Sequence, residues 1–126
     1  MTLIRSLCAA GLLLGSALPA FAASESPAYG PELQGFQYPY PVEHFTFESQ
    51  GKPLKMGYMD VPAEGKANGR TVVLMHGKNF CAATWDASIK ALSADGYRVI
   101  APDQIGFCTS SKPDHYQYSF QQLAIN

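Results

Sequence analysis

Residues 71–80, TVVLMHGKNF, and residues 98–110, RVIAPDQIGFCTS, decide the fold of this chain. In both stretches a run of apolar residues leads directly into a loop that carries glycine and polar side chains. A continuous apolar run, rather than an alternating one, is typical of a parallel strand that helices cover on both faces. The sequence therefore predicts two buried parallel strands, over 71–75 and 98–102, each followed by a polar loop.

A helix is predicted between these two strands. Thr84 is placed to cap its N-terminus, and Trp85, Ile89 and Leu92 recur at the spacing of one helical face. Gly96 supplies the left-handed residue that ends many helices, and the residue after it is placed to contact Leu92. Strand, helix and strand with short links form a βαβ unit, whose crossover is right-handed in nearly all known cases.

An antiparallel hairpin is expected before this unit. Residues 42–49 and 54–61 alternate between apolar and polar side chains, and Gln50-Gly51-Lys52 lies between them as the turn. The apolar side chains expected to share faces are Phe45 and Phe47 in the first strand, and Leu54, Met56 and Tyr58 in the second. Residues 62–70 are polar and contain glycine, as a loop in solvent does.

Residues 23–41 form an extended leader rich in proline, glycine and tyrosine. No helical or strand period is present in it. Its aromatic side chains have two interpretations: a patch that binds a ligand, or a strap whose rings pack onto the first strands. We favour the strap. The aromatic residues concerned are Tyr29, Phe36, Tyr38 and Tyr40.

The N-terminus has the organisation of a secretory signal peptide, predicted over residues 1–22. Arg5 supplies its positive charge, residues 7–17 form its apolar segment, and Ala20-Phe21-Ala22 is a cleavage site with small residues. The apolar segment is too short to cross roughly 30 Å of hydrocarbon. We therefore expect cleavage after Ala22, a secreted or periplasmic protein, and no membrane span after cleavage.

Composition restricts the partners that the protein could have. The chain has 126 residues, with 9 Lys and Arg against 10 Asp and Glu, and its formal net charge is −1. It lacks basic runs and aromatic residues interleaved with Lys or Arg, so nothing indicates nucleic-acid binding. A small neutral or mildly polar molecule is the expected partner, and the oligomeric state stays open.

The last residues carry dense signals for the start of a helix. Ser119 and Gln122 match a capping box, and Tyr118 and Leu123 stand at the positions of a hydrophobic staple. The sequence then ends at Asn126, after about two turns and without a C-cap. A mature chain of this size is also well below the roughly 200 to 250 residues that large α/β domains use. We therefore expect that the chain is part of a longer one.

The two loops resemble those of the α/β-hydrolase superfamily. There, one strand leads into His-Gly-x and the next into Asp-x-x-Gly-x-Gly-x-Ser, as His76-Gly77-Lys78 and residues 103–110 do here. Cys108 stands where that pattern usually has its second glycine. The resemblance covers residues 42–126 and implies a partial α/β-hydrolase domain: an antiparallel hairpin followed by a βαβ unit with parallel strands, truncated before the nucleophile elbow.

The resemblance also implies roles for individual residues. Lys78 is expected to contribute its backbone N–H to an oxyanion hole, which stabilises negative charge in acyl-transfer enzymes. His76, Gly77, Asp103 and Gly106 are expected to support the two loops. Gly77 is expected to take a backbone conformation closed to other residues.

The superfamily's remaining catalytic groups come later in the chain. The sequence contains no Gly-x-Ser-x-Gly elbow, and neither the catalytic acid nor the histidine is reached. The resemblance thus implies a parent that hydrolyses an ester, amide, epoxide or similar bond in a small molecule, without metal or organic cofactor, and a chain that is itself inactive. The alternative is a non-catalytic relative that binds ligands. An elbow with Ser or Asp encoded about one strand beyond Asn126 would favour the enzyme, and Gly or Ala there the binding protein.

Several polar side chains invite a stronger role than their surroundings support. His76 could act as a general base, but bracing its loop by hydrogen bonds is favoured. Asp103 could act as an acid, but accepting backbone N–H bonds within its own loop is favoured. The Lys78 ammonium could attract an anion, although a side chain in solvent is favoured. Ser110 and Ser111 lack an identifiable base, so neither is expected to be a nucleophile.

Two cysteines remain after signal cleavage, and their pairing depends on the resemblance. In that superfamily the two strands are neighbours, so the loops with Cys81 and Cys108 leave the same edge side by side. A disulfide there would contribute roughly 3 to 4 kcal/mol by restricting the unfolded chain. The alternative is a pair of buried, unreactive thiols. Both remain open, and we favour the bridge because both cysteines survive export.

Overall fold

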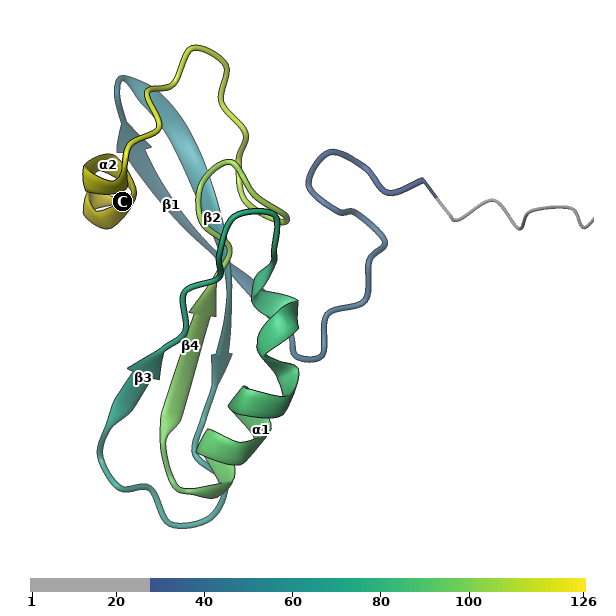
Figure 1. Ribbon diagram of the computed structural model, residues 1–126, viewed down its shortest axis with the longest axis vertical. Coiled ribbons are helices and arrows are strands. Elements are labelled where there is room, and N and C mark those ends of the chain that lie inside the picture. Colours follow the sequence, from purple (N-terminus) through teal and green to yellow (C-terminus); the bar gives the residue numbers. More distant parts are fainter. Residues whose placement is uncertain (1–27) are drawn as a thin grey trace, which may run out of the picture.

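The computed structural model describes residues 28–126, so the predicted signal peptide and its cleavage site lie outside the described residues. The elements are β1 (Val42–Ser49), β2 (Lys52–Val61), β3 (Thr71–Val73), the 3₁₀ helix η1 (Ala82–Trp85), α1 (Asp86–Ala94), β4 (Arg98–Pro102) and α2 (Phe120–Ile125). The four strands form one mixed sheet in the order β1-β2-β4-β3 (Figure 1). β2 pairs antiparallel with both β1 and β4, and β3 pairs parallel with β4. The predicted hairpin followed by a βαβ unit is confirmed.

The hairpin turn is tighter than predicted. Ser49 pairs with Lys52, so the turn consists of Gln50 and Gly51 alone, with φ angles of 51° and 68°. Two consecutive positive φ angles belong to the type I′ turn, whose twist matches that of the flanking strands. Lys52 is therefore the first residue of β2, and its predicted place in the turn was wrong.

The main core lies between α1 and one face of the sheet. Met59 and Val61 of β2 meet Val99 of β4 and Ile89 of α1, all at most 7% exposed. These β2 residues alternate out of phase with Leu54, Met56 and Tyr58, the side chains that were expected to share one face. The prediction therefore missed half of the burial, because β2 is a central strand and is covered on both faces.

A second cluster covers part of the opposite face. Leu54 packs there with Ile105 and Tyr116, and Phe47 and Leu123 lie against them. The chain after β4 folds back across the hairpin and brings α2 to this face (Figure 1). Two small cores thus share one sheet.

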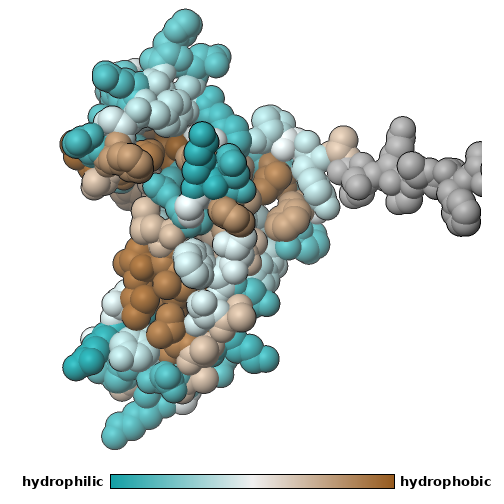
Figure 2. Space-filling view, in the orientation of Figure 1, coloured by the Kyte–Doolittle hydropathy of each residue, from teal (hydrophilic) through white to brown (hydrophobic). Residues whose placement is uncertain are grey.

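The edge strand β3 departs from the expectation for residues 71–75. Val73 is 55% exposed and Met75 is 50% exposed, so this run is not buried on both faces. The reason is geometric: β3 is the outer strand of the described sheet, and α1 covers only the face toward which Leu74 packs. Figure 2 shows an apolar area over this part of the molecule. Among residues 28–126, no helix is long and apolar enough to cross a membrane.

The helix between the parallel strands begins earlier than predicted. A 3₁₀ turn starts at Ala82, and Trp85 occupies the cap position of α1 without a side-chain hydrogen bond. Thr84 is not the cap, since its hydroxyl donates to the carbonyl of Cys81 at 2.8 Å. The C-terminal end is as predicted. Tyr97 N–H donates to the Leu92 carbonyl and Gly96 N–H donates to the Ser93 carbonyl, which is a Schellman ending.

The capping box of α2 is only half formed. Ser119 accepts a hydrogen bond from the backbone N–H of Gln122 at 3.1 Å, as predicted. The side chain of Gln122 does not return to Ser119. It donates to Ser49 and Asn126 instead, because the end of β1 lies within its reach.

Substitution of Gly96 tests the Schellman ending. Gly96 has a φ of +85°, and an added Cβ would lie 2.7 Å from the Lys66 carbonyl oxygen. We expect Gly96→Ala to lower the free energy of unfolding in urea by about 2 kcal/mol or more, from backbone strain plus the clash. Gly65→Ala is the matched control, since its φ is +70° with nothing within 4 Å. That change should cost about 1 kcal/mol, and equal losses would contradict the packing argument.

Candidate functional site

The loop after β3 makes a tight turn with exposed backbone donors. Phe80 N–H donates to the Gly77 carbonyl at 3.2 Å, and Asn79, the third residue of the turn, has a φ of 69°. Asn tolerates this conformation better than most residues. Gly77 itself has no left-handed φ, so the expectation that it takes a conformation closed to other residues was wrong. Asn79 takes the left-handed conformation instead. No residue among 28–126 accepts a hydrogen bond from the N–H of Lys78 or Asn79, and both residues are exposed.

His76 connects this loop to the loop after β4. The side chain is 4% exposed, and its Nε2 accepts a hydrogen bond from Gln104 N–H at 2.9 Å. Nδ1 therefore carries the proton and donates to the Gly77 carbonyl at 2.9 Å. Gln104 also donates through its side chain to the His76 carbonyl at 2.8 Å. Both ring nitrogens are occupied, so the geometry is that of a brace rather than of a general base.

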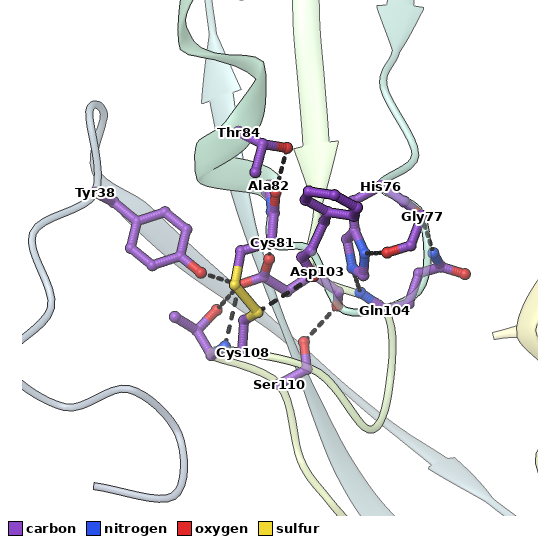
Figure 3. The surroundings of a disulfide bond; sticks show 12 residues. Tyr38, His76, Gly77, Cys81, Ala82, Thr84, Asp103, Gln104, Cys108 and Ser110 are labelled. Atoms are coloured by element: carbon purple, nitrogen blue, oxygen red, sulfur yellow. Dashed lines mark hydrogen bonds between the residues drawn. A yellow bond between two sulfur atoms is a disulfide. The ribbon is translucent and has the colours of Figure 1, made fainter. Parts of the chain in front are cut away.

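Asp103 is the buried centre of the site, at 1% exposure. Its Oδ1 accepts from Ala82 N–H at 2.7 Å, and its Oδ2 accepts from the backbone and hydroxyl of Thr109 at 3.0 and 2.6 Å. The Tyr38 hydroxyl donates to Oδ2 at 2.6 Å (Figure 3). The sequence predicted donors only from the loop of Asp103 itself. Tyr38 and Ala82 were missed because they come from distant parts of the chain.

Tyr38 makes the leader part of the site. Burial, followed by the hydrogen bond to Asp103 and the negative charge of its carboxylate, raises the pKa of Tyr38 above its ordinary value of 10.0. Tyr38 and Tyr40 pack against the main core. Phe36 contacts Tyr29 on one side and Tyr38 on the other, each edge to face with ring centroids 5.5 Å apart. These contacts are those of a strap on the sheet.

A disulfide joins Cys81 and Cys108, whose Cα atoms are 5.8 Å apart (Figure 3). Each cysteine directly precedes a donor to Asp103, namely Ala82 and Thr109. Cys108 has a φ of 45°, the conformation that favours the glycine of the superfamily pattern. The bridge therefore holds a residue in a backbone conformation that it does not prefer.

Ser110 and Ser111 have structural roles. Ser110 Oγ accepts from Gly57 N–H at 2.9 Å and donates to the Asp103 carbonyl. Ser111 Oγ accepts from Lys55 N–H at 2.9 Å. Both hydroxyls thus accept hydrogen bonds from backbone N–H groups of β2, beyond the point where the neighbouring strand β4 ends.

Close packing accompanies this pairing. A Cβ at Gly57 would lie 2.0 Å from the Thr109 hydroxyl, so only glycine fits opposite Thr109. Lys112 donates to the carbonyls of Cys108 at 2.7 Å and Ser110 at 3.2 Å. Burial lowers the pKa of Lys112 below its ordinary value.

Two cavities flank the site. One of about 530 Å³ lies between the leader and the hairpin, and Tyr38, His44 and Lys55 are among its lining residues. Another of about 330 Å³ is lined by Gly106, Phe107, Tyr118 and Leu123, on the far side of the loop after β4. Lys78 lines neither of these two cavities, and the residue is exposed in the described part of the chain.

Comparisons with known proteins agree with the resemblance of the loops. A family model described as the alpha/beta hydrolase fold matches residues 70–125. A haloalkane dehalogenase of Mycobacterium marinum is 40% identical over 77 residues, which cover 60% of this chain and 25% of that protein. Epoxide hydrolase A of Mycobacterium tuberculosis is 42% identical over 63 residues, which cover 49% of this chain and 20% of that protein.

A solved structure is similar over more of the chain. The crystal structure of a probable hydrolytic enzyme from Pseudomonas aeruginosa PAO1 is 65% identical with a TM-score of 0.76, and the match covers 79% of this chain and 31% of that one. The chain thus spans between a fifth and a third of the length of these relatives. The predicted fold class, an N-terminal part of this fold, is confirmed.

Tyr38→Phe tests whether the leader stabilises the site. At neutral pH we expect a loss of about 1.5 to 3 kcal/mol in the free energy of unfolding, because a buried carboxylate loses a donor. The pKa of Tyr38 is higher in the folded state than in the unfolded state. The stabilisation that the Tyr38 hydroxyl gives to the fold is therefore complete below the unfolded pKa of about 10, and it is lost as pH rises from there through the folded pKa. The difference between wild type and variant should therefore shrink at alkaline pH. Tyr29→Phe is the control in the same aromatic row, and equal behaviour of the two variants would refute the role.

The backbone of Cys108 is tested with the bridge removed in both arms. Cys81→Ala combined with Cys108→Gly should be more stable than Cys81→Ala combined with Cys108→Ala by about 1 kcal/mol, since glycine adopts a φ of 45° freely. Urea unfolding of the two double variants measures the difference. A more stable alanine variant would show that the bridge, and not the backbone, selects this conformation.

Proposed function

Because this chain belongs to the α/β-hydrolase superfamily and carries an N-terminal part of its fold, we propose that it supplies half of the oxyanion hole of an exported hydrolase. The N–H of Lys78 is the donor. The second donor, the nucleophile, the acid and the histidine would come from sequence outside this chain, so the chain alone is inactive.

The main support for this proposal is the backbone N–H of Lys78 and the turn that holds it. This N–H has no acceptor among residues 28–126, and it stands in a turn whose conformation is fixed by Asn79 and by the His76 brace. An oxyanion donor must be in place before charge develops, because reorientation during the reaction would cost part of its benefit. A turn held in this way supports the assignment of the Lys78 N–H as such a donor.

A small molecule is the proposed substrate. The relatives are a haloalkane dehalogenase and an epoxide hydrolase by name. We extend the bond broken here to an ester, amide, epoxide, carbon–halogen or similar bond. The nearly balanced charge of the chain favours a neutral or mildly polar substrate over a polyanion.

Export is part of the same proposal. The predicted signal peptide over residues 1–22 supports it, and so does the Cys81–Cys108 disulfide, because such bonds persist in oxidising compartments. A secreted or periplasmic location follows. Protein purified from the periplasm or the medium should begin at Ala23.

The backbone donor can be removed without disturbing the turn. Lys78 is the second residue of a turn whose third residue has a positive φ, and proline is favoured at that second position. Lys78→Pro in the protein expressed from the complete reading frame should lower kcat by about 100- to 1,000-fold, measured on a panel of activated esters, epoxides and haloalkanes.

Lys78→Ala is the matched control, since it keeps the N–H and removes only the ammonium. It should retain activity within a few-fold of wild type. A proline variant as active as the alanine variant would refute the oxyanion assignment. A wild-type protein that binds members of the panel without hydrolysing any would favour the binding protein instead.

A further inference from the structure

We propose that reduction of the Cys81–Cys108 disulfide creates, together with Asp103, a binding site for a borderline-soft divalent cation such as Zn²⁺. The site goes beyond the hydrolase function and does not depend on it. No metal was expected from the sequence, because Cys81 lies 22 and 27 residues before Asp103 and Cys108. Only the fold brings them together.

The first observation is proximity. The two sulfur atoms and a carboxylate oxygen of Asp103 all lie within 4.8 Å of one another. In Figure 3 the disulfide lies directly beside the Asp103 carboxylate. Thiolates and carboxylates are both established zinc ligands, and three protein ligands are enough when a water or another donor completes the tetrahedron.

The second observation concerns charge. Asp103 is 1% exposed, yet the ion pairs of the described residues join Lys55 to Glu32 and Arg98 to Asp60, and none includes Asp103. A buried carboxylate that is held by hydrogen bonds alone gains from a nearby cation. Oδ1 accepts one hydrogen bond, from Ala82, so a lone pair remains for a metal.

The geometry of the two loops suits tetrahedral coordination. Metal–sulfur bonds of about 2.3 Å place two thiolates about 3.8 Å apart. The Cα atoms of Cys81 and Cys108 are 5.8 Å apart, so we expect rotation of the side chains alone to reach this spacing. The carbonyl oxygen of Phe80, 3.4 Å from the Cys108 sulfur, is a candidate fourth ligand.

The chemistry is a reduction followed by an exchange of protons for metal. A thiol reductant supplies two electrons and two protons, which break the sulfur–sulfur bond and form two thiols while the reductant becomes a disulfide. Binding of the cation then releases the two thiol protons, giving two thiolates and an unchanged carboxylate. Both cysteines are half-buried, so a small reductant has access. Exchange with a disulfide oxidant, which is itself reduced to two thiols, re-forms the Cys81–Cys108 bond and releases the cation.

The site therefore provides two alternative cross-links between the same loops. In the oxidised state the disulfide joins them, and in the reduced state the cation does. The Asp103 carboxylate stays in place in both states, with its donors from Ala82 and Thr109.

The experiment is a titration of the whole chain with Co²⁺, a spectroscopic substitute for Zn²⁺, after reduction by a phosphine that does not compete for metal. Reduced wild type should bind one Co²⁺ per chain with sulfur-to-metal charge-transfer absorption, and Zn²⁺ should displace it. Oxidised wild type, with the same sequence and blocked sulfurs, is the matched control and should show no such band. Identical spectra for the two states would overturn the proposal.

The carboxylate is tested separately. Asp103→Asn should weaken Co²⁺ binding at least about 10-fold, whereas binding by a pair of thiols in a loosened chain would be unaffected. If the Asn variant does not fold, X-ray absorption of the zinc-loaded reduced wild type decides. Two sulfur and at least one oxygen neighbour support the site, and a shell of four sulfurs shared between two chains rejects it.

Discussion

The buried carboxylate of Asp103 is the constraint on which the rest of the site depends. Its two oxygens accept hydrogen bonds from the leader at Tyr38, from the first turn of the helix at Ala82 and from its own loop at Thr109. A carboxylate in this position cannot lose donors cheaply, because each unsatisfied polar atom in the interior costs about 1 to 3 kcal/mol. One carboxylate thus positions these three segments. The disulfide joins two of them, the start of the helix and the loop of Asp103. The turn that presents the Lys78 N–H is held to the same loop through His76.

Local patterns predicted those parts of the fold whose causes are local. The hairpin, the two parallel strands and the Schellman ending at Gly96 each follow from neighbouring residues, and all are present. The errors arose where a distant segment competes. Thr84 does not cap the helix because the chain is already turning at Ala82, whose N–H is bound by a side chain from the next loop. The face of β2 that carries Met59 and Val61 was missed because its cover, α1, comes from a later part of the chain.

The site shows the same division. The motifs identified the two loops and favoured the bracing role of His76. The pairing of the two cysteines was left open from the sequence, with a preference for the bridge that is present. Tyr38 could not have been found, since nothing in a Pro- and Tyr-rich leader distinguishes a ring that reaches a buried carboxylate from one that lies on the surface. Asn79 carried a weak signal, because Asn is the residue other than glycine that most readily takes a positive φ.

The close contact between Gly57 and Thr109 links β2 to the loop after β4. This contact limits which substitutions the two positions can tolerate. Because β2 is buried on both faces, a slip of one residue along β1 or β4 would place the side chains of each core in the other. A Cβ at Gly57 would meet the Thr109 side chain, so this close contact marks the register. A larger residue at 57 is tolerable only if 109 shrinks at the same time. In a set of related sequences these two positions should therefore change together, although 52 residues separate them.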